Sequence, residues 1–214
     1  MGGTLLLVIL FAGAGLGLWL FQRRRSRLLA AAGSLDQAAA ALGGQVQRSR
    51  RDPGRGAVLF DESGQRFRLY REHRAQPGEE QALCVVEAET ALYHGPDLIL
   101  AGGSGASHLV TAARTVWPLP WPDLEERATA LAHDDPMPSL APILDDEEAR
   151  RLVRYALDHR GARLRLSARG CWFECDGFAD NGELVAATAR TAARALARLL
   201  ELPGGKTLPA RGKP

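Results

Sequence analysis

TLLLVILFAGAGLGLWLF, residues 4–21, is followed directly by QRRRSR, residues 22–27. This apolar stretch and the arginines after it decide how the rest of the chain is expected to be organised. The eighteen residues of the apolar stretch include no charged residue, no proline and no asparagine. As a helix they would extend roughly 27 Å, close to the thickness of the hydrocarbon core of a bilayer. Because a helix satisfies its own backbone groups in lipid, the stretch predicts a transmembrane helix.

Positive charge lies on only one side of this stretch. Four arginines follow it, whereas residues 1–3 carry no charged side chain. Since arginines beside a span stay on the cytoplasmic side, we expect a single-pass protein of the inner (plasma) membrane with residues 1–3 outside. A signal peptide is the alternative, but it would place positive charge before the apolar stretch and a small-residue cleavage site after it. We also expect contact with anionic lipid headgroups from these arginines: Arg23, Arg24, Arg25 and Arg27.

Gly13 and Gly17 form a Gly-x-x-x-Gly pair inside the apolar stretch. Residues four apart share a helix face, and small ones let a second backbone approach closely. The pair predicts a helix–helix contact in the membrane and a homodimer through it, although glycine is also common in spanning helices.

Charge is segregated along the chain. The net charge is +6 over residues 22–55, −7 over 56–201 and +3 over 202–214, which together give +2. We therefore expect a basic juxtamembrane helix and linker at 22–55, a cytoplasmic α+β domain at 56–201 and a basic flexible tail at 202–214. A nucleic-acid-binding domain would carry its basic patch on the folded part, so no nucleic-acid partner is expected.

The first half of the chain reads as one helix followed by strands. An alanine-rich pattern predicts a helix from Leu28 to Leu42, with Ser34 as N-cap and Gly43–Gly44 as its end. Residues 45–55 and 71–80 are predicted to be loops. Strands are predicted at 56–60 and 66–70, joined as a hairpin by residues 61–65, and at 82–87 and 97–101.

The second half contains the clearest helices. Residues 108–116 and 123–133 are predicted helical, although 123–133 is also compatible with a strand, and 117–122 and 134–144 are predicted irregular. Helices are predicted at 145–160 and 183–200, around a hairpin of RLRLS and CWFEC. The side chains expected in the core of these helices are Leu152, Val153, Ala156, Leu157, Leu184, Val185, Ala192, Ala195, Leu196 and Leu199. The predicted fold class is thus α+β, an N-terminal transmembrane helix followed by a soluble domain of antiparallel β-hairpins packed with amphipathic helices.

The glycine-rich segment 101–107, AGGSGAS, is the main candidate for ligand chemistry. It follows a predicted strand and precedes a predicted helix, where backbone N–H groups can hold a phosphate. Gly103, Ser104 and Gly105 are therefore candidate cofactor-binding residues. The segment is not a dinucleotide fingerprint, because His108 stands where glycine is required, and a flexible turn explains it equally well.

No other pattern indicates catalysis or metal binding. Cys171 and Cys175 alternate with Trp172 and Glu174, so both thiols should be buried on one face of a strand, about 13 Å apart. The five histidines are scattered without metal-ligand spacing. No cofactor, metal or catalytic residue is therefore predicted. The sequence favours a binding or scaffold module with an unknown protein partner, and the alternative is a membrane-tethered hydrolase or nucleotide/phosphate binder that uses segment 101–107.

Overall fold

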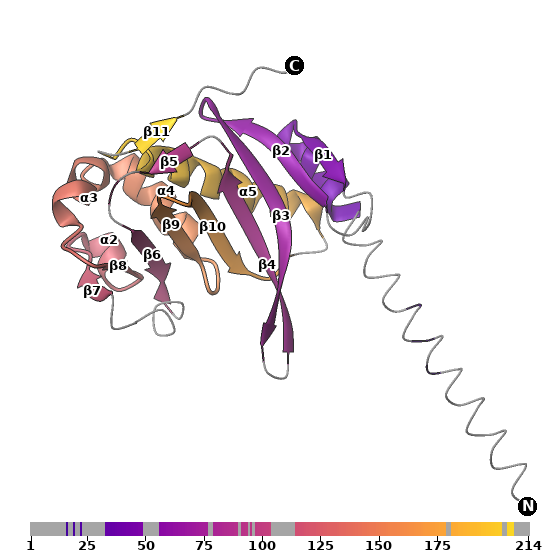
Figure 1. Ribbon diagram of the computed structural model, residues 1–214, viewed down its shortest axis with the longest axis horizontal. Coiled ribbons are helices and arrows are strands. Elements are labelled where there is room, and N and C mark those ends of the chain that lie inside the picture. The colour runs from indigo at the N-terminus through magenta and orange to yellow at the C-terminus, as the bar shows by residue number, and fades with distance from the viewer. Residues whose placement is uncertain are drawn as a thin grey trace, which may run out of the picture.

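The computed structural model shows a large antiparallel sheet with helices on one side (Figure 1). The residues that the structure describes are Leu16, Trp19, Gln22, 33–48, 56–76, 79–89, 91–93, 95, 97–103, 114–178, 181–202 and 205–207.

The strands, in chain order, are β1 (Gln45–Arg48), β2 (Gly56–Glu62), β3 (Gln65–Gln76), β4 (Glu79–Ala88), β5 (Ala91–Tyr93), β6 (Leu98–Gly102), β7 (Thr115–Pro118), β8 (Ala128–Ala132), β9 (Arg163–Ser167), β10 (Gly170–Asp176) and β11 (Gly205–Thr207). Residues 33–42 are helical, and the later helices are α2 (Pro122–Glu125), α3 (Met137–Leu144), α4 (Glu147–Leu157) and α5 (Gly182–Leu199).

Nine strands form one sheet in the order β1-β2-β3-β4-β10-β9-β6-β8-β7, with every pair antiparallel. Strands β11 and β5 form a separate two-stranded sheet. Strands β10 and β9, near the C-terminus of the chain, lie between β4 and β6, so the centre of the sheet joins distant parts of the sequence. The α+β character of the fold is confirmed.

The structure contradicts the prediction of a transmembrane helix. Within the described part of the chain, no helix is both long enough and apolar enough to cross a membrane. The longest described helix there, α5, carries Glu183 and three arginines and packs on the sheet. Of residues 4–21, only Leu16 and Trp19 are described, and the rest of the stretch lies outside the described residues. The predicted single-pass inner-membrane location, with an external N-terminus and a cytoplasmic domain, is contradicted by the same finding.

The first predicted hairpin is confirmed with a tighter turn. Strands β2 and β3 pair with Phe60 opposite Phe67, and the ring centroids of these two lie 5.8 Å apart. The turn consists of Ser63 and Gly64, both with positive φ (51° and 75°), in place of the predicted five-residue loop. Positive φ at both central residues is what a two-residue hairpin turn requires to match the twist of its strands.

Two predicted loops are strands. β1 occupies the start of the predicted loop 45–55, and its exposed polar residues explain the error, because an edge strand needs no buried face. Strand β3 continues to Gln76 and β4 begins at Glu79, so most of the predicted loop 71–80 belongs to a long hairpin.

The region before α4 also differs from the prediction. Residues 128–132 form β8 instead of a helix, and Thr115–Pro118 forms β7. Alanine favours a helix intrinsically, but β8 is buried between β6 and β7, and this pairing outweighs local propensity. The predicted connector 134–144 contains helix α3, whose Leu140 and Leu144 are buried.

The C-terminal helices and hairpin are confirmed. Asp146 caps α4 by accepting a hydrogen bond from the amide of Glu148, and Asn181 caps α5. The predicted core positions of these helices are buried except Leu184, which is 57% exposed, and Leu152, which is half-buried.

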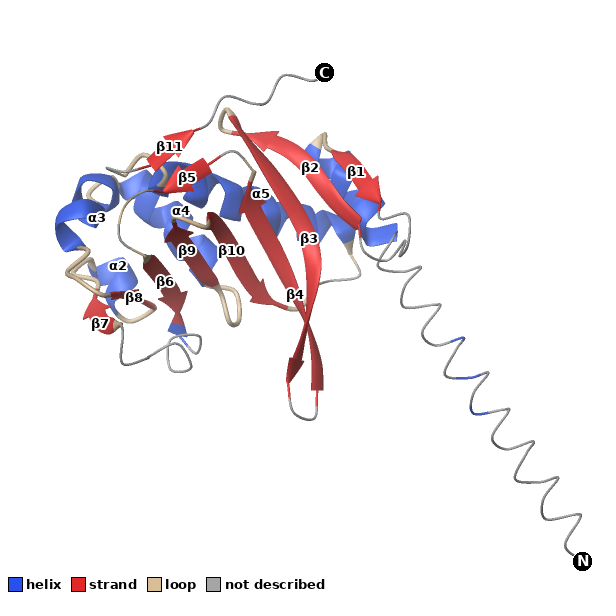
Figure 2. Cartoon of the chain, viewed as in Figure 1, coloured by secondary structure: helices blue, strands red, loops and turns tan. Residues whose placement is uncertain are grey.

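The core lies between the helices and one face of the sheet (Figure 2). Helix α5 packs on β4 and β10, and α4 packs on α5 and β6. The helical residues 33–42 belong to the same core through Leu35 and Leu42, and Arg190 of α5 donates a hydrogen bond to the carbonyl of Ala41. This helix ends as predicted at Gly43, which has a φ of +66°. Ser34 is not its N-cap, because it is buried and already inside the helix.

Candidate functional site

The two faces of the nine-stranded sheet differ in what covers them. On β10, Cys171, Phe173 and Cys175 point into the core under the helices, as the alternation of CWFEC predicts. The alternate residues Trp172 and Glu174 lie on the other face, where no helix packs among the described elements. An antiparallel sheet commonly leaves one face to solvent, but such a face is ordinarily lined by exposed side chains.

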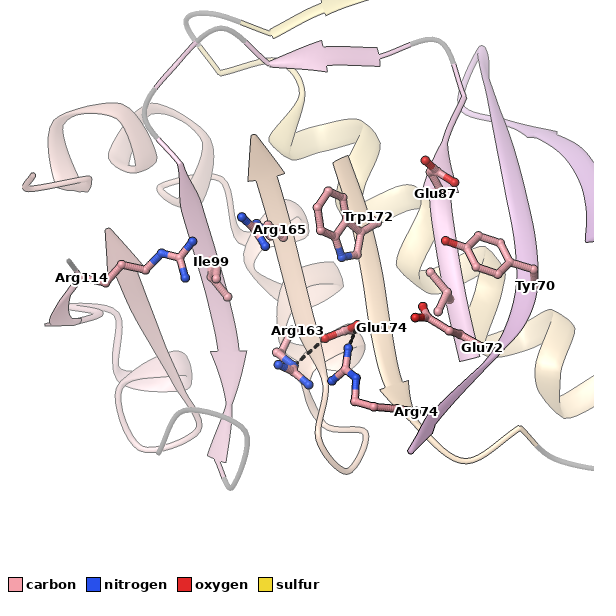
Figure 3. Close-up of a pocket in the computed structure, with 11 residues that line it drawn as sticks. Tyr70, Glu72, Arg74, Glu87, Ile99, Arg114, Arg163, Arg165, Trp172 and Glu174 are labelled. Carbon is pink, nitrogen blue, oxygen red and sulfur yellow. Dashed lines mark hydrogen bonds and ion pairs between the residues drawn. The ribbon is translucent and has the colours of Figure 1, made fainter. Parts of the chain in front are cut away.

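A hollow of about 380 Å³ lies on this open face, across the central strands (Figure 3). Strand pairing places its side chains in rows: Glu87, Trp172, Arg165 and Ile99 are successive cross-strand neighbours. The residues that line it are Tyr70, Glu72, Arg74, Val85, Glu87, Ile99, Arg114, Arg163, Arg165, Trp172 and Glu174. The volume is in the usual range for small-molecule sites.

Glu174 is held between two arginines at the floor of the hollow. Its carboxylate is 2.8 Å from Arg163 Nε and accepts a hydrogen bond of 3.2 Å from Arg74 Nη2. The Arg163 contact is an ion pair without hydrogen-bond geometry, since that Nε has no hydrogen-bond partner. The Glu174 side chain is only 10% exposed, and a carboxylate this buried requires opposite charge beside it.

Asp97 is the centre of a second cluster of the same kind. Arg165 donates two parallel hydrogen bonds of 3.1 Å to its two carboxylate oxygens, and Arg114 donates a third. Burial alone would raise the pKa of Asp97, but the hydrogen bonds from Arg114 and Arg165 outweigh burial and lower this pKa. Asp97 therefore remains ionised and fixes both guanidinium groups beside the hollow.

Trp172 lies in the middle of the hollow. The guanidinium carbon of Arg165 is 5.0 Å from the centroid of its ring, a cation–π contact that orients both side chains. Figure 3 shows the indole between Arg165 and Glu87. Within the described residues, the indole N–H has no hydrogen-bond partner, so it remains a donor for a ligand.

The wall formed by β3 and β4 carries two carboxylates, and its one lining arginine among the described residues, Arg74, is paired with Glu174. Glu72 and Glu87 make no hydrogen bond or ion pair with any described residue. Tyr70 lies beside them, and burial together with the charges of Glu87 and Glu72 raises its pKa to about 12. Its hydroxyl therefore stays protonated and can donate a hydrogen bond at neutral pH.

Two titratable groups at the hollow have pKa values shifted away from neutrality. The pKa of Tyr70 and that of Asp97 both move away from neutrality, whereas a general acid or base works best with a pKa near the working pH. Among the described residues that line the hollow there is no histidine and no cysteine. The arrangement offers fixed guanidinium donors, carboxylate acceptors and an aromatic surface.

A second hollow, of about 290 Å³, lies beside α5 and is mostly apolar. Cys84 and Cys175 face each other there across β4 and β10, a pairing that the sequence alone did not indicate. A hydrogen bond with Cys175 and burial both raise the pKa of Cys84, so its thiol is protonated and unreactive. His159, in the same hollow, has its pKa lowered by burial.

Gly103, the predicted site residue that the structure describes, lines neither hollow. Its N–H donates to the carbonyl of Arg127 at 2.8 Å, so this amide is not available to a phosphate. The other predicted site residues lie outside the described residues: Gly13, Gly17, Arg23, Arg24, Arg25, Arg27, Ser104 and Gly105.

Sequence reasoning missed the hollow although its signal is present in the strands. In RFRL (66–69) and RLRLS (163–167), charged residues alternate with buried ones, which also describes an ordinary solvated face. Only the order of the strands shows that the charged sides of β3, β9 and β10 meet. A comparison of the chain with family models, curated proteins and solved structures found no match.

Proposed function

We propose that this protein is a ligand-binding module and that it binds its ligand in the hollow on the open face of the sheet. The observation that carries the proposal is the partial burial of several charged side chains that line this hollow, above all two arginines and Glu174. Arg163 and Arg114 are only 19% and 20% exposed, which is unusual for arginines that merely keep a sheet face in solvent.

Burial of these arginines has a cost that the fold offsets with dedicated carboxylates. Asp97 and Glu174 each hold two guanidinium groups, so their positions are set before any ligand arrives. Fixed side chains lose little conformational entropy on binding, and this preorganisation raises affinity. An accidental salt bridge on an exposed face would give no such convergence of two clusters around one hollow.

The alternative of an enzyme that uses segment 101–107 has no support from the described geometry. The one candidate in that segment that the structure describes, Gly103, has its amide engaged within the fold. A binding role requires only the donors, acceptors and aromatic surface that line the hollow.

A thermal-shift screen on the full-length chain tests the proposal. The compounds are amino acids, short peptides, dicarboxylates, inorganic phosphate, nucleotides and divalent cations. We expect at least one compound to raise the Tm, and we expect Trp172→Ala to abolish that shift. The matched control is Tyr155→Ala, because Tyr155 is exposed on α4, on the helix-covered side of the sheet.

Two results would contradict the proposal. One is a stabilising compound whose effect survives Trp172→Ala, which would place its site elsewhere. The other is stabilisation that requires a nucleotide together with a divalent cation and is unchanged by Trp172→Ala, which would favour the enzyme alternative.

A further inference from the structure

Unpaired positive and negative groups lie on different sides of the hollow, and this arrangement restricts the charge distribution of a ligand that fits it. On one side, Asp97 neutralises only one of its two arginines, Arg114 and Arg165, which leaves an excess positive charge. Arg163 and Arg74 share Glu174 in the same way. Arg163 and Arg165 on β9, with Arg114 just before β7, therefore form a basic side. Arg74 comes from β3 and reaches across to Glu174, so it is engaged at the base of the hollow.

The opposite wall has the reverse imbalance. Glu72 and Glu87 have no ion-pair partner among the described residues. Arg68 is the cross-strand neighbour of Glu87, but its guanidinium lies over the ring of Tyr70, 5.3 Å from the centroid, and makes no ion pair with Glu87. Figure 3 shows Glu72, Glu87 and Tyr70 together on one side of the hollow, with Arg114 and Arg165 on the other.

Unused hydrogen-bonding capacity follows the same division. A guanidinium has five N–H donors, and Arg165 uses its Nε and one Nη2 donor on Asp97. On the other side, Glu72 and Glu87 have carboxylate oxygens that accept no hydrogen bond from the described residues. The basic side can therefore donate to an anionic group while the acidic side accepts from a cationic one.

The spacing of the two sides is fixed by the sheet. Glu87, Trp172 and Arg165 are neighbours in one cross-strand row, so Glu87 and Arg165 are two strand spacings apart. At about 4.8 Å per strand, their backbones are roughly 10 Å apart. Trp172 stands between them and offers an apolar surface to the middle of a ligand.

We propose that the hollow binds a zwitterionic ligand whose ammonium and carboxylate groups lie at opposite ends of a chain, of ω-amino-acid or short-peptide type. Its carboxylate lies against Arg114, Arg163 and Arg165, its ammonium group lies against Glu72 and Glu87, and the uncharged segment between them crosses Trp172. This inference rests on the proposed function, since it names the class of ligand for the same hollow.

The test compares four small probes by isothermal titration calorimetry on the full-length chain. They are 6-aminohexanoate, which has both charges at the ends of a six-carbon chain; hexanoate and hexylammonium, which have one each; and glycine, whose charges are too close together to reach both walls. We expect 6-aminohexanoate to bind at least about tenfold more tightly than each of the other three, because it adds a second charge-assisted contact.

Glu87→Gln tests the acidic wall and should fold normally, because Glu87 has no ion-pair partner in the described fold. We expect it to weaken 6-aminohexanoate about tenfold while the affinity for hexanoate is unchanged. Glu183→Gln, an exposed position in the first turn of α5, is the matched control and should change neither affinity.

The outcomes separate this inference from the proposed function. If hexanoate binds as tightly as 6-aminohexanoate, or if Glu87→Gln leaves the preference intact, the zwitterionic class is wrong and the hollow remains a binding site. If none of the four probes binds while a compound from the thermal-shift screen does so in a Trp172-dependent way, the inference also fails. If no compound of either set binds, both proposals fail.

Discussion

Leu199→Ala should be one of the most destabilising substitutions in α5, whereas Leu184→Ala in the same helix should be mild. Leu199 is fully buried in the core, and Leu184 is 57% exposed. Removing three carbons at about 0.8 kcal/mol each gives a transfer loss of about 2.4 kcal/mol for Leu199. The cavity that remains adds to this loss, so the expected total is about 3–5 kcal/mol. For Leu184 the expected loss is under about 1 kcal/mol.

Urea unfolding of the full-length chain, followed by far-UV circular dichroism, measures both values. Arg194→Ala is a further control, since Arg194 is half-exposed and donates one hydrogen bond of 2.8 Å to Glu62. A surface pair of this kind contributes about 0.2–1 kcal/mol. If Leu184→Ala or Arg194→Ala were more damaging than Leu199→Ala, the face of α5 that packs on the sheet would be wrongly assigned.

Three further predictions follow from burial and charge. Because the pKa of Asp97 is lowered in the fold, its ionised form contributes stability that is complete above the usual pKa of an aspartate and is lost as the pH falls through the folded pKa. Asp97→Asn should therefore lower the Tm at pH 7 and make the Tm less sensitive to acid. Equal profiles of Tm against pH for the two proteins would contradict this. The three buried cysteines should not react with a thiol reagent at pH 7 until urea unfolds the chain, and rapid labelling of the native protein would show that one is accessible. A fragment that begins at residue 56 should be less stable than one that begins at residue 33, by about 3–6 kcal/mol for the two leucines of helical residues 33–42, and equal urea midpoints would place that helix outside the core.

The elements with strong local patterns were predictable from the sequence. Helices α4 and α5 have clear apolar stripes, and the hairpins β2–β3 and β9–β10 alternate around short polar turns. The errors occur where tertiary context decides the structure. The alanine-rich β8 is a strand because it is buried between two others, and β1 is an edge strand with no apolar face to reveal it.

The hollow could not be predicted because its described side chains come from six elements: β3, β4, β6, β9, β10 and the approach to β7. Tyr70, Glu87, Arg114 and Arg165 are brought together only by the strand order β3-β4-β10-β9-β6 and the approach to β7. Each of these residues, taken alone, is consistent with a solvated strand face. Asp97 is the first residue of a predicted strand, but nothing local indicates that it binds two arginines distant in the sequence.

The chemical shift of the Trp172 indole N–H tests the central claim most directly. The chain has four tryptophans, so a two-dimensional ¹H–¹⁵N spectrum contains a small, separate set of indole signals that Trp172→Phe assigns. Trp117 and Trp121 pack against the core under the helices and serve as internal controls. When the compound with the largest thermal shift is added, we predict that the Trp172 signal moves in a saturable way while the signals of Trp117 and Trp121 stay in place. Movement of Trp117 or Trp121 with an unchanged Trp172 signal would contradict the assignment of the hollow as the binding site.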